Sequence, residues 1–529
     1  MSEHAERPTY VLRTLERMAE YGDREAIVGV GWDCRLTYAQ TRTMVLDLAA
    51  VLRDAGYRPG MTVAVMVAHP PEAFPLQLAL HLLGCRTVWV AHSATAVELD
   101  DIVSRIPPER LIYDTRTHAK QGADLAARLG VPVHCLRPDG AGPDLLAPPP
   151  AGIEPFDLDT AVGEPRSVFQ TTGTTGRPKL LVHGPGMYEQ MFQIADDWVA
   201  AGEPQLRHLA LTAMWHASGQ AAALLNLVSG GVFYVLWRFR PAEYLGLIEQ
   251  YRATSGFVSP LMLYQLLDDP TAATADVSSM KLLGVGGAAV SAPRLREAIK
   301  RFGPIFRIAY GMSELPWVAT YPYIDEDPAH PDRLRSCGQP HGDVRAEIRD
   351  DDGRVLPPGE VGELWVSSRL TFLGYHGDQE RTAEALVDGW FRTRDMAFVD
   401  EEGYLHVIGR ADDMIITGLG SYHVFPRPIE DVLTSHPQVR AAAVIGVPDP
   451  ERGHAPYAYA VTAPGATVTP EELCDLVVQK LHRPWRPLTV EFVEDLPRTE
   501  FGKVDVKALK ARWAAEHQAG HQAAAVPVG

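Results

Sequence analysis

The sequence has little of what marks several protein classes. Its formal net charge is −18 and its pI about 5.5, so no global basic field attracts nucleic acid or an anionic membrane. The five cysteines stand far apart, without the paired spacing of a zinc site or a disulfide framework. We expect them to be reduced thiols of a cytoplasmic protein that binds neither nucleic acid nor a membrane.

A signal peptide and a long unbroken apolar run are also missing. Residues 1–14 mix both charge signs and lack an apolar core. The most apolar long stretch, 219–237, is interrupted by Asn226, Ser229 and Gly230. A buried helix followed by a strand explains this stretch better than a membrane span.

The sequence does show alternating helix and strand patterns in a chain of 529 residues, which is long enough for several cores. Strand-like runs at 62–67 and 87–90 flank a helical pattern at 72–83. Such alternation predicts βαβ units around a largely parallel sheet. Thr37 and Gln40 form a capping box at the start of an earlier helix. The predicted fold class is therefore α/β.

Turn signals and composition divide the chain. Turns crowd from Glu363 onward and predict a β-rich subdomain inside a large N-terminal domain, residues 1–410. Beyond it, 411–516 has the pattern of a small α+β C-terminal domain. Residues 517–529 carry Ala, Gly and Gln with little to bury, and we predict a disordered tail.

One loop combines the groups that a polyphosphate needs. It lies between two strand-like runs and reads TTGTTGRPK from Thr171 to Lys179. Gly173 and Gly176 allow positive φ angles and bring backbone N–H groups close to an anion. In the strand-to-helix phosphate loop, by contrast, Lys directly follows the second Gly and a helix begins. The loop is predicted to bind phosphate, although such a loop alone is more often an ordinary turn.

Further motifs follow along the chain. In YGMSE, Tyr310 can stack on a purine and Glu314 can hold Mg²⁺. In FRTRD, Asp395 can accept both hydroxyls of a ribose, and Arg410 in GRADD can assist it. Lys503 lies on a turn in LPRTEFGK. Taken singly, each motif is more simply interpreted as a strand end, a solvated ion pair or a surface lysine.

Taken together and in this order, these motifs and GEL at 362–364 resemble the adenylate-forming superfamily of acyl-CoA synthetases, peptide-synthetase adenylation domains and beetle luciferases. The resemblance extends from about Gly22 to Leu509. It implies that a carboxylate attacks the α-phosphate of Mg·ATP, that pyrophosphate leaves, and that a thiol then captures the acyl-AMP. Catalysis is then mainly alignment and charge neutralisation.

The resemblance also implies a role for individual residues. Lys503 would bridge the substrate carboxylate and the α-phosphate, and Glu314 would hold Mg²⁺. Asp412 would be the hinge about which a mobile C-terminal domain rotates, so that Lys503 serves only the first half-reaction. The implied catalytic residues are Lys503, Glu314, His216 and Thr174. The implied nucleotide-binding residues are Thr171, Thr172, Gly173, Thr175, Gly176, Lys179, Gly287, Ala288, Ala289, Tyr310, Gly311, Met312, Ser313, Asp395 and Arg410.

The acyl side of the site is predicted from Trp215 and His216. Amino-acid-activating relatives carry an Asp here that pairs with the α-ammonium, and His216 supplies no fixed negative charge. We therefore expect a carboxylic acid without a free α-amino group. Small Ser259 and Gly286 are expected to leave room for a bulky or polycyclic apolar skeleton. The predicted substrate residues are Trp215, Phe257, Val258, Ser259, Gly286, Leu315 and Trp317.

The sequence also departs from the family pattern. Arg394 stands where glycine is usual before Asp395, and would crowd the ribose or add a cation. From Gly418 to Glu430 the chain reads GLGSYHVFPRPIE, where CoA-using relatives usually show a second Gly followed by Glu-Asn. Tyr422 would narrow the thiol route, so adenylation is better supported than transfer to CoA.

The leading prediction is an ATP-dependent acid–CoA ligase that uses ATP, Mg²⁺ and CoA. A close alternative is an acyl-AMP ligase that hands its adenylate to another protein's thiol or to a carrier protein. From a different class, the chain would be a catalytically silent nucleotide-binding regulator. The joint presence of the threonine-rich loop, Glu314, Asp395 and Lys503 argues against that last alternative.

Overall fold

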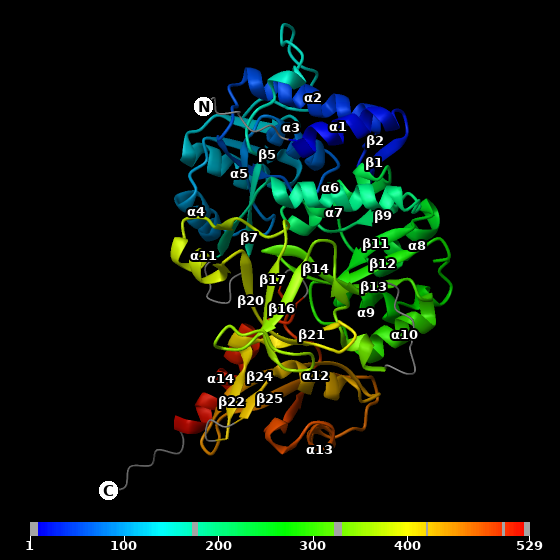
Figure 1. The fold of residues 1–529 in the computed structure, drawn as a ribbon, viewed down its shortest axis with the longest axis vertical. Coiled ribbons are helices and arrows are strands. Elements are labelled where there is room, and N and C mark those ends of the chain that lie inside the picture. The colour runs from blue at the N-terminus through cyan, green and yellow to red at the C-terminus, as the bar shows by residue number, and fades with distance from the viewer. Residues whose placement is uncertain (1–8, 172–177, 322–330, 419–421, 500–502, 523–529) are drawn as a thin grey trace.

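The computed structural model describes residues 9–171, 178–321, 331–418, 422–499 and 503–522. Within these ranges the strands form four sheets. Three sheets build a large N-terminal part, and the fourth builds a small C-terminal domain at the other end of the molecule from the first helices (Figure 1). The predicted α/β class with a large and a small domain is confirmed.

One sheet of the large part has the strand order β18-β8-β7-β4-β3-β5-β6. Strands β7 to β6 along this order are parallel, whereas β8 and β18 run antiparallel at the edge. Every residue of β3 is buried, as expected for a parallel sheet covered on both faces. The bounds are β3 Thr62–Met66, β4 Arg86–Trp89, β5 Arg110–Asp114, β6 Val133–Leu136, β7 Arg166–Thr171, β8 Lys179–His183 and β18 Gly374–Tyr375.

The second sheet has the order β15-β14-β13-β12-β11-β9-β10-β1-β2. Its middle strands, β13 to β1, are parallel, so their carboxyl ends share one edge. Ligands of open α/β sheets bind at such an edge. The bounds are β1 Glu25–Val30, β2 Arg35–Thr37, β9 Arg207–Ala210, β10 Val232–Leu236, β11 Ser255–Val258, β12 Leu282–Gly286, β13 Phe306–Met312, β14 Leu315–Tyr321 and β15 Gln339–Pro340.

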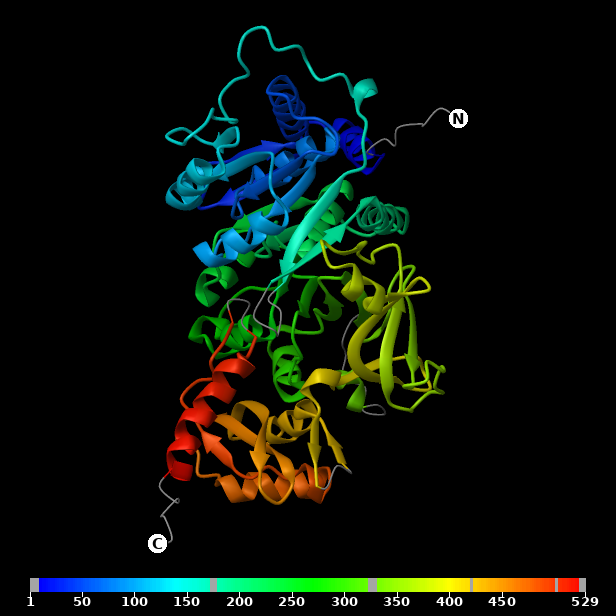
Figure 2. The same cartoon turned by 90° about the vertical axis from the view of Figure 1, so that its left-hand side faces the viewer.

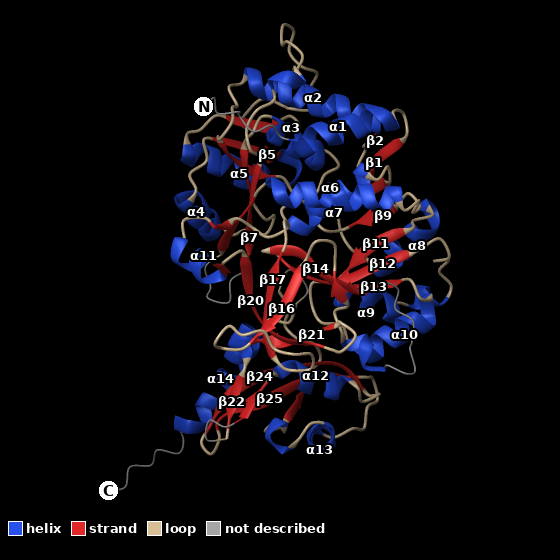
Figure 3. Ribbon diagram, in the orientation of Figure 1, coloured by secondary structure: helices blue, strands red, loops and turns tan. Residues whose placement is uncertain are grey.

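Helices pack on both sheets (Figure 3). The capping box of Thr37 and Gln40 begins α2 as predicted. Helix α3 is buried on all sides, as its apolar sequence AFPLQLALHL requires. The α-helices are α1 Thr9–Tyr21, α2 Tyr38–Asp54, α3 Ala73–Leu82, α4 Ala96–Arg105, α5 Thr115–Leu129, α6 Pro185–Ala200, α7 Ala217–Val228, α8 Pro241–Tyr251, α9 Pro260–Asp268 and α10 Ala292–Phe302. Short 3-10 helices are η1 Leu158–Thr160, η2 Pro270–Ala273 and η3 Pro331–Arg335.

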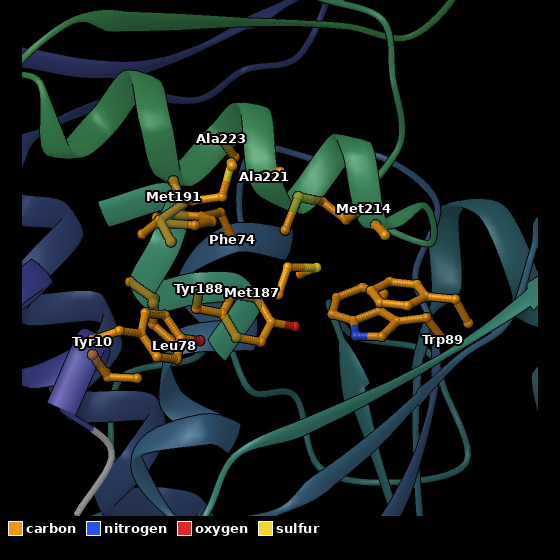
Figure 4. Packing of buried hydrophobic residues seen from close by; sticks show 14 of the residues in the cluster. Tyr10, Phe74, Leu78, Trp89, Met187, Tyr188, Met191, Met214, Ala221 and Ala223 are labelled. Atoms are coloured by element: carbon orange, nitrogen blue, oxygen red, sulfur yellow. The ribbon is translucent and has the colours of Figure 1, made fainter. Parts of the chain in front are cut away.

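The main core of the large part combines side chains from α1, α3, α6 and α7 with strand residues (Figure 4). The rings of Tyr10 and Tyr188 stack with centroids 4.6 Å apart. The Tyr188 hydroxyl donates to Ser167 at 2.7 Å, and Ser167 lies on β7. The strand that leads into the phosphate loop is thus fixed by a buried network.

A third sheet forms the predicted β-rich subdomain, with the order β16-β17-β20-β19 and β21 paired to β20. It begins earlier than the turn pattern indicated, at Arg345 rather than Glu363. The bounds are β16 Arg345–Arg349, β17 Gly362–Ser367, α11 Gln379–Ala385, β19 Leu386–Val387, β20 Trp390–Val399 and β21 Leu405–Arg410.

The small domain follows the 3-10 helix η4, Ala411–Asp413. Its sheet has the order β23-β22-β25-β24, with β26 beside β25. In Figure 2 the chain just before α14, drawn in red, reaches from this domain toward the large part. The bounds are β22 Ile415–Thr417, β23 Tyr422–Val424, α12 Pro426–Thr434, β24 Val439–Asp449, β25 Gly453–Thr462, α13 Pro470–Lys480, η5 Arg483–Trp485, β26 Val490–Phe492 and α14 Val506–Gln522.

The end of the chain differs from the prediction of a disordered tail from 517. Helix α14 continues to Gln522. Alanine and glutamine are good helix formers, so a helix already started at Val506 extends through residues that have little to bury. Of the predicted tail, residues 523–529 lie outside the described residues.

Candidate active site

The hairpin turn that carries Glu314 is held by two hydrogen bonds to its backbone carbonyl groups. His183, at the end of β8, donates from Nε2 to the Ser313 carbonyl at 2.7 Å. The backbone N–H of Phe372 donates to the Glu314 carbonyl at 2.8 Å. Burial lowers the pKa of His183 to about 4, so the imidazole is neutral at physiological pH. These contacts fix Glu314 beside the strand that leaves the phosphate loop.

The Glu314 carboxylate meets the loop lysine through Tyr375. The Tyr375 hydroxyl donates to Glu314 Oε1 at 3.0 Å, and Lys179 Nζ lies 5.3 Å from the centroid of the Tyr375 ring. Burial lowers the pKa of Lys179, an effect that the nearby Glu314 charge opposes. Sequence reasoning missed Tyr375, because its partners stand far away in the chain.

Asp395 is the centre of a second polar group. It is 6 % exposed, accepts a hydrogen bond from the Tyr310 hydroxyl, and pairs with Arg410 Nε at 3.2 Å. Asp395 and Arg410 are direct partners in the β20–β21 ladder, which explains why the two motifs meet. Burial raises the pKa of Asp395 and Arg410 lowers it. YGMSE, FRTRD and GRADD are thus brought together as predicted.

Lys503 reaches this group from the small domain. It is exposed over part of its surface, yet surrounding protein atoms crowd its ammonium. That burial and the Arg410 charge lower the pKa of Lys503, and Asp395 and Glu314 raise it. The charge of Lys503 also contributes to the lowered pKa of His216, so its influence extends to the predicted acyl residues.

A small cavity adjoins Tyr310. Its walls include the predicted Ala288 and Ala289 together with Ser336, Cys337 and Arg427, which sequence reasoning missed. Gly287 has φ +86°, which a glycine adopts easily, and it turns the chain at the end of β12. Tyr310 to Met312 lie within β13 rather than after a strand as predicted. The cavity thus lies between the end of β12, the Tyr310 strand and the small domain's Arg427.

Gly311 allows two strands to pack closely, rather than allowing a ligand to approach the backbone. A Cβ at Gly311 would stand 2.3 Å from the Pro316 carbonyl oxygen, so only glycine lets β13 and β14 approach here. Met312 pairs with Leu315 across the same hairpin. Of the predicted phosphate loop, Thr171 and Lys179 are described, and Thr172, Gly173, Thr174, Thr175 and Gly176 lie outside the described residues.

His216 lies after the carboxyl end of β9, immediately before α7. It is the N-cap residue of α7, with Trp215 beside it at a ring-centroid distance of 5.8 Å. Burial lowers its pKa to about 4, with smaller contributions from His69 and Lys503. The imidazole is therefore neutral at physiological pH, in line with the absence of a fixed negative charge.

The structure changes the explanation for the other acyl residues. Gly286 leaves no room, because a Cβ there would stand 2.5 Å from the Ala309 oxygen and 3.0 Å from Phe257 Cζ. Ser259 is the N-cap of α9 and accepts from the Met262 N–H. Val258 is fully buried in the core, because adjacent strand residues point to opposite faces and Phe257 takes the other face. Leu315 is fully buried as well.

Trp317 remains at the acyl side, stacked on His341 with ring centroids 4.3 Å apart. Within the described residues, the buried indole N–H groups of Trp215 and Trp317 have no hydrogen-bond partner. A buried donor without an acceptor is costly, and a bound molecule is one way to satisfy it.

A larger cavity of about 410 Å³ opens where the carboxyl ends of β1 and β10 meet the start of α5. Trp32 and Trp237 line it, together with the charged residues Arg116, Arg238 and Glu243. Arg116 lies 4.5 Å from the Trp32 ring centroid. Strand β10 neighbours β9, so the cavity is roughly one or two strand spacings, about 5–10 Å, from the strand that precedes His216.

Three further features of the structure bear on the earlier predictions. Within the described residues no group of three or more His, Cys, Asp or Glu side chains is arranged to hold a metal ion. Among the same residues, no helix is both long and apolar enough to cross a membrane. Arg394, which was expected to crowd the ribose or add a cation, instead pairs with Asp412.

Asp395 and Arg410 form an ion pair on the large part, and the charge of Lys503 from the small domain acts on them. This arrangement is the one expected of an adenylate-forming ligase. Comparisons with known proteins agree. Residues 15–376 match the family model of the AMP-binding enzymes, and residues 428–503 match the model of their C-terminal domain. The chain belongs to the AMP-binding enzyme family, and it is an enzyme that activates a carboxylic acid with ATP.

Individual relatives cover nearly the whole chain. The medium/long-chain-fatty-acid–CoA ligase FadD8 of Mycobacterium tuberculosis is 38 % identical over 499 residues, 91 % of this chain and 86 % of the relative. The feruloyl-CoA synthase of an Amycolatopsis species is 34 % identical over 473 residues, 89 % and 92 % of the two chains. The structure of the amide bond synthetase McbA from Marinactinospora thermotolerans has a TM-score of 0.84 and 35 % identity, and covers 96 % of this chain and 99 % of its own.

Proposed function

We propose that this chain joins ATP and an apolar carboxylic acid without a free α-amino group into an acyl-adenylate and pyrophosphate, and then transfers the acyl group to CoA. The observation that carries the proposal is the electrostatic reach of Lys503. Its charge acts on Asp395, whose carboxylate belongs to the Tyr310 and Arg410 group, and also on His216. A cation with this reach can act on both reacting groups.

In the first half-reaction a carboxylate oxygen bonds to the α-phosphorus and the bond to pyrophosphate breaks. Lys503 offsets the negative charge that grows on the phosphoryl oxygens, and its alignment of the two anions lowers the barrier. Asp395 orients the ribose, and Lys179 binds the outer phosphates. Neutral His216 lies against the acid carboxylate without repelling it or adding a charge.

Glu314 fits a magnesium ion, which in nucleotide enzymes is typically held by one or two carboxylates and the substrate's phosphates rather than by a cage of protein ligands. Tyr375 occupies Glu314 Oε1, which orients the carboxylate. The ion would supply charge neutralisation at the phosphates. The second oxygen of Glu314 is the group that would hold it.

The acid is proposed to carry hydrogen-bond acceptors on its apolar skeleton. The indole N–H groups of Trp215 and Trp317 are buried and lack partners within the described residues, and an oxygen of the acid would satisfy one or both. The feruloyl group named for a relative has such oxygens. A bulky or polycyclic skeleton remains a prediction.

CoA is proposed as the thiol, and the cavity beside Arg116 supports it. Two indole rings and two guanidinium groups suit a base and phosphates, and the site lies within reach of a pantetheine arm from His216. The thiol sulfur bonds to the acyl carbon, the bond to AMP breaks, and the thiol proton is released.

A second candidate is transfer of the acyl group to an acceptor other than CoA, either an amine or another protein's thiol. The observation that favours it is the altered segment after the hinge, where Tyr422 is 52 % exposed and stands where CoA-using relatives usually show glutamate. McbA, 35 % identical, is named an amide bond synthetase.

A pyrophosphate-release screen of aliphatic, aryl and polycyclic acids tests the first half-reaction. Release that depends on one class of acid is expected, and no release with any acid would refute the proposal. The enzyme with its formed adenylate is then offered CoA, a primary amine, or a phosphopantetheinyl carrier protein. Mass spectrometry of the product separates the candidates, and the thioester of CoA is the expected result.

A further inference from the structure

Arg394 has an unusual backbone for a residue with a side chain. Its φ is +63°, in the left-handed region that L-amino acids rarely adopt. It directly precedes Asp395 on β20, and glycine would take this conformation without strain. The presence of an arginine at this position therefore indicates that its side chain makes a functional contact.

The side chain of Arg394 reaches the segment that joins the two domains. Its Nη2 lies 3.1 Å from Asp412 Oδ1. Asp412 is in η4, between the last strand of the third sheet and the first strand of the small domain. The ion pair thus links a rigid strand of the large part to the short connection on which the small domain turns.

This ion pair is a poor candidate for a stabiliser of the fold. The two side chains are 50 % and 58 % exposed, and exposed pairs contribute little to the free energy of unfolding. A small free energy has a visible effect, however, on an equilibrium between two domain arrangements of similar stability, because it changes their populations several-fold.

The negative charge of Asp412 also opposes the binding of a polyphosphate, and the positive charge of Arg394 partly compensates for it. The Asp412 charge acts on Lys179 and Arg410, two cations of the nucleotide site. A carboxylate that competes for these cations would repel a polyphosphate. An arginine on the far side of Asp412 gives the carboxylate another partner and keeps Lys179 for the substrate.

We propose that Arg394 is a positioning residue that holds the hinge residue Asp412 in the arrangement in which Lys503 faces Asp395 and Glu314, and that it thereby sets the balance between the two half-reactions. The proposal rests on the proposed function and on the expectation, implied by the family resemblance, that one domain arrangement serves adenylation and another serves acyl transfer. A change of backbone angles at 412 carries its carboxylate away from Arg394, so this ion pair breaks when the domain turns.

Arg394→Gly tests the proposal, because glycine suits φ +63° and removes only the side chain. Pyrophosphate formation by the full chain is expected to slow about two- to five-fold, the range that an exposed ion pair of up to about 1 kcal/mol allows. Acyl transfer from supplied adenylate is expected to stay the same or to rise. Hydrogen exchange in residues 411–418 is expected to become faster while Tm is unchanged or higher.

The matched control is Arg392→Ala, which removes the 2.8 Å ion pair with Glu363 two residues earlier on the same strand. It is expected to leave the ratio of the half-reactions unchanged. Arg394→Lys, which keeps the charge, should restore most of the adenylation rate. Equal changes in both half-reactions of Arg394→Gly, or none in either, would overturn the proposal. The proposed function fails separately, when the unmodified protein releases no pyrophosphate.

Discussion

The hydroxyl of Tyr310 donates a hydrogen bond to the carboxylate of Asp395, 85 residues further along the chain. Tyr310 lies on β13 of the second sheet, and Asp395 lies on β20 of the third. The nucleotide side of the site therefore exists only when these two sheets have docked. Burial raises the pKa of Tyr310, so the phenol stays protonated and keeps donating.

Replacing Asp395 with alanine should mainly weaken ATP binding. The carboxylate is expected to accept charge-assisted hydrogen bonds from the ribose, each worth about 1.5–3 kcal/mol, so the Kd for ATP should rise roughly 10- to 100-fold. Titration of the purified variant with ATP measures it. Tyr310→Phe, which leaves the carboxylate in place, should cost less. An unchanged ATP affinity in Asp395→Ala would show that the ribose binds elsewhere.

Lys503→Ala should abolish most of the adenylation activity. Loss of a charge aligned with the transition state costs roughly 3 kcal/mol or more, which is over a hundred-fold in rate. Pyrophosphate exchange reports this step. Transfer from acyl-adenylate supplied from outside should survive, because the lysine then has no part in the reaction. Lys507→Ala, a nearby cation of α14, serves as the control.

Loss of the Arg116 guanidinium should raise the KM for CoA. If the nucleotide end of CoA lies between Trp32 and Arg116, the Arg116→Ala variant loses a phosphate contact worth about 1–2 kcal/mol, or about 5- to 30-fold. The KM for pantetheine, which has no nucleotide, should be unchanged. A variant that loses affinity for both thiols equally would contradict this placement of CoA.

Acidification should destabilise the protein between about pH 6.5 and 4. Burial lowers the pKa of His69, His183 and His208 to about 4 each, so the unfolded chain binds protons in this window that the folded chain does not. Each such histidine removes up to about 1.4 kcal/mol of stability per pH unit as the pH falls. The buried carboxyl of Glu430, whose pKa is raised to about 7, acts in the opposite direction but is outnumbered.

Urea denaturation at pH 7 and pH 5 measures this effect. The midpoint should be lower at pH 5. His208→Gln, which removes one of the buried rings whose pKa is lowered, should shift less between the two pH values than the unmodified protein. A midpoint that rises on acidification would mean that the carboxyl groups dominate instead.

The local patterns of the sequence were sufficient for much of the fold. The capping box at Thr37 depends on residues three apart, and the apolar run of α3 depends on composition alone, so both could be predicted without tertiary information. The boundary at η4 and the α+β pattern after it followed from turn chemistry. The end of α14 did not, because helix continuation competes with the absence of burial.

The acyl pocket shows where local reasoning failed. Gly286 and Ser259 are small residues, and the sequence favoured the interpretation that they leave space. In the structure Phe257 and the Ala309 carbonyl fill the position beside Gly286, and Ser259 caps a helix. Neighbours across a sheet decide whether a missing side chain leaves a hole, and those neighbours are distant in the chain.

The order of the motifs by itself determined that this chain handles ATP and a carboxylate, since it fixed which charged and small residues are present. Only the tertiary structure decided which of them meet: His183 with Ser313, Tyr375 with Glu314, Arg394 with Asp412. The physical reason is range. Propensity and periodicity act over a few residues, whereas these contacts depend on how separately formed sheets and a small domain pack together.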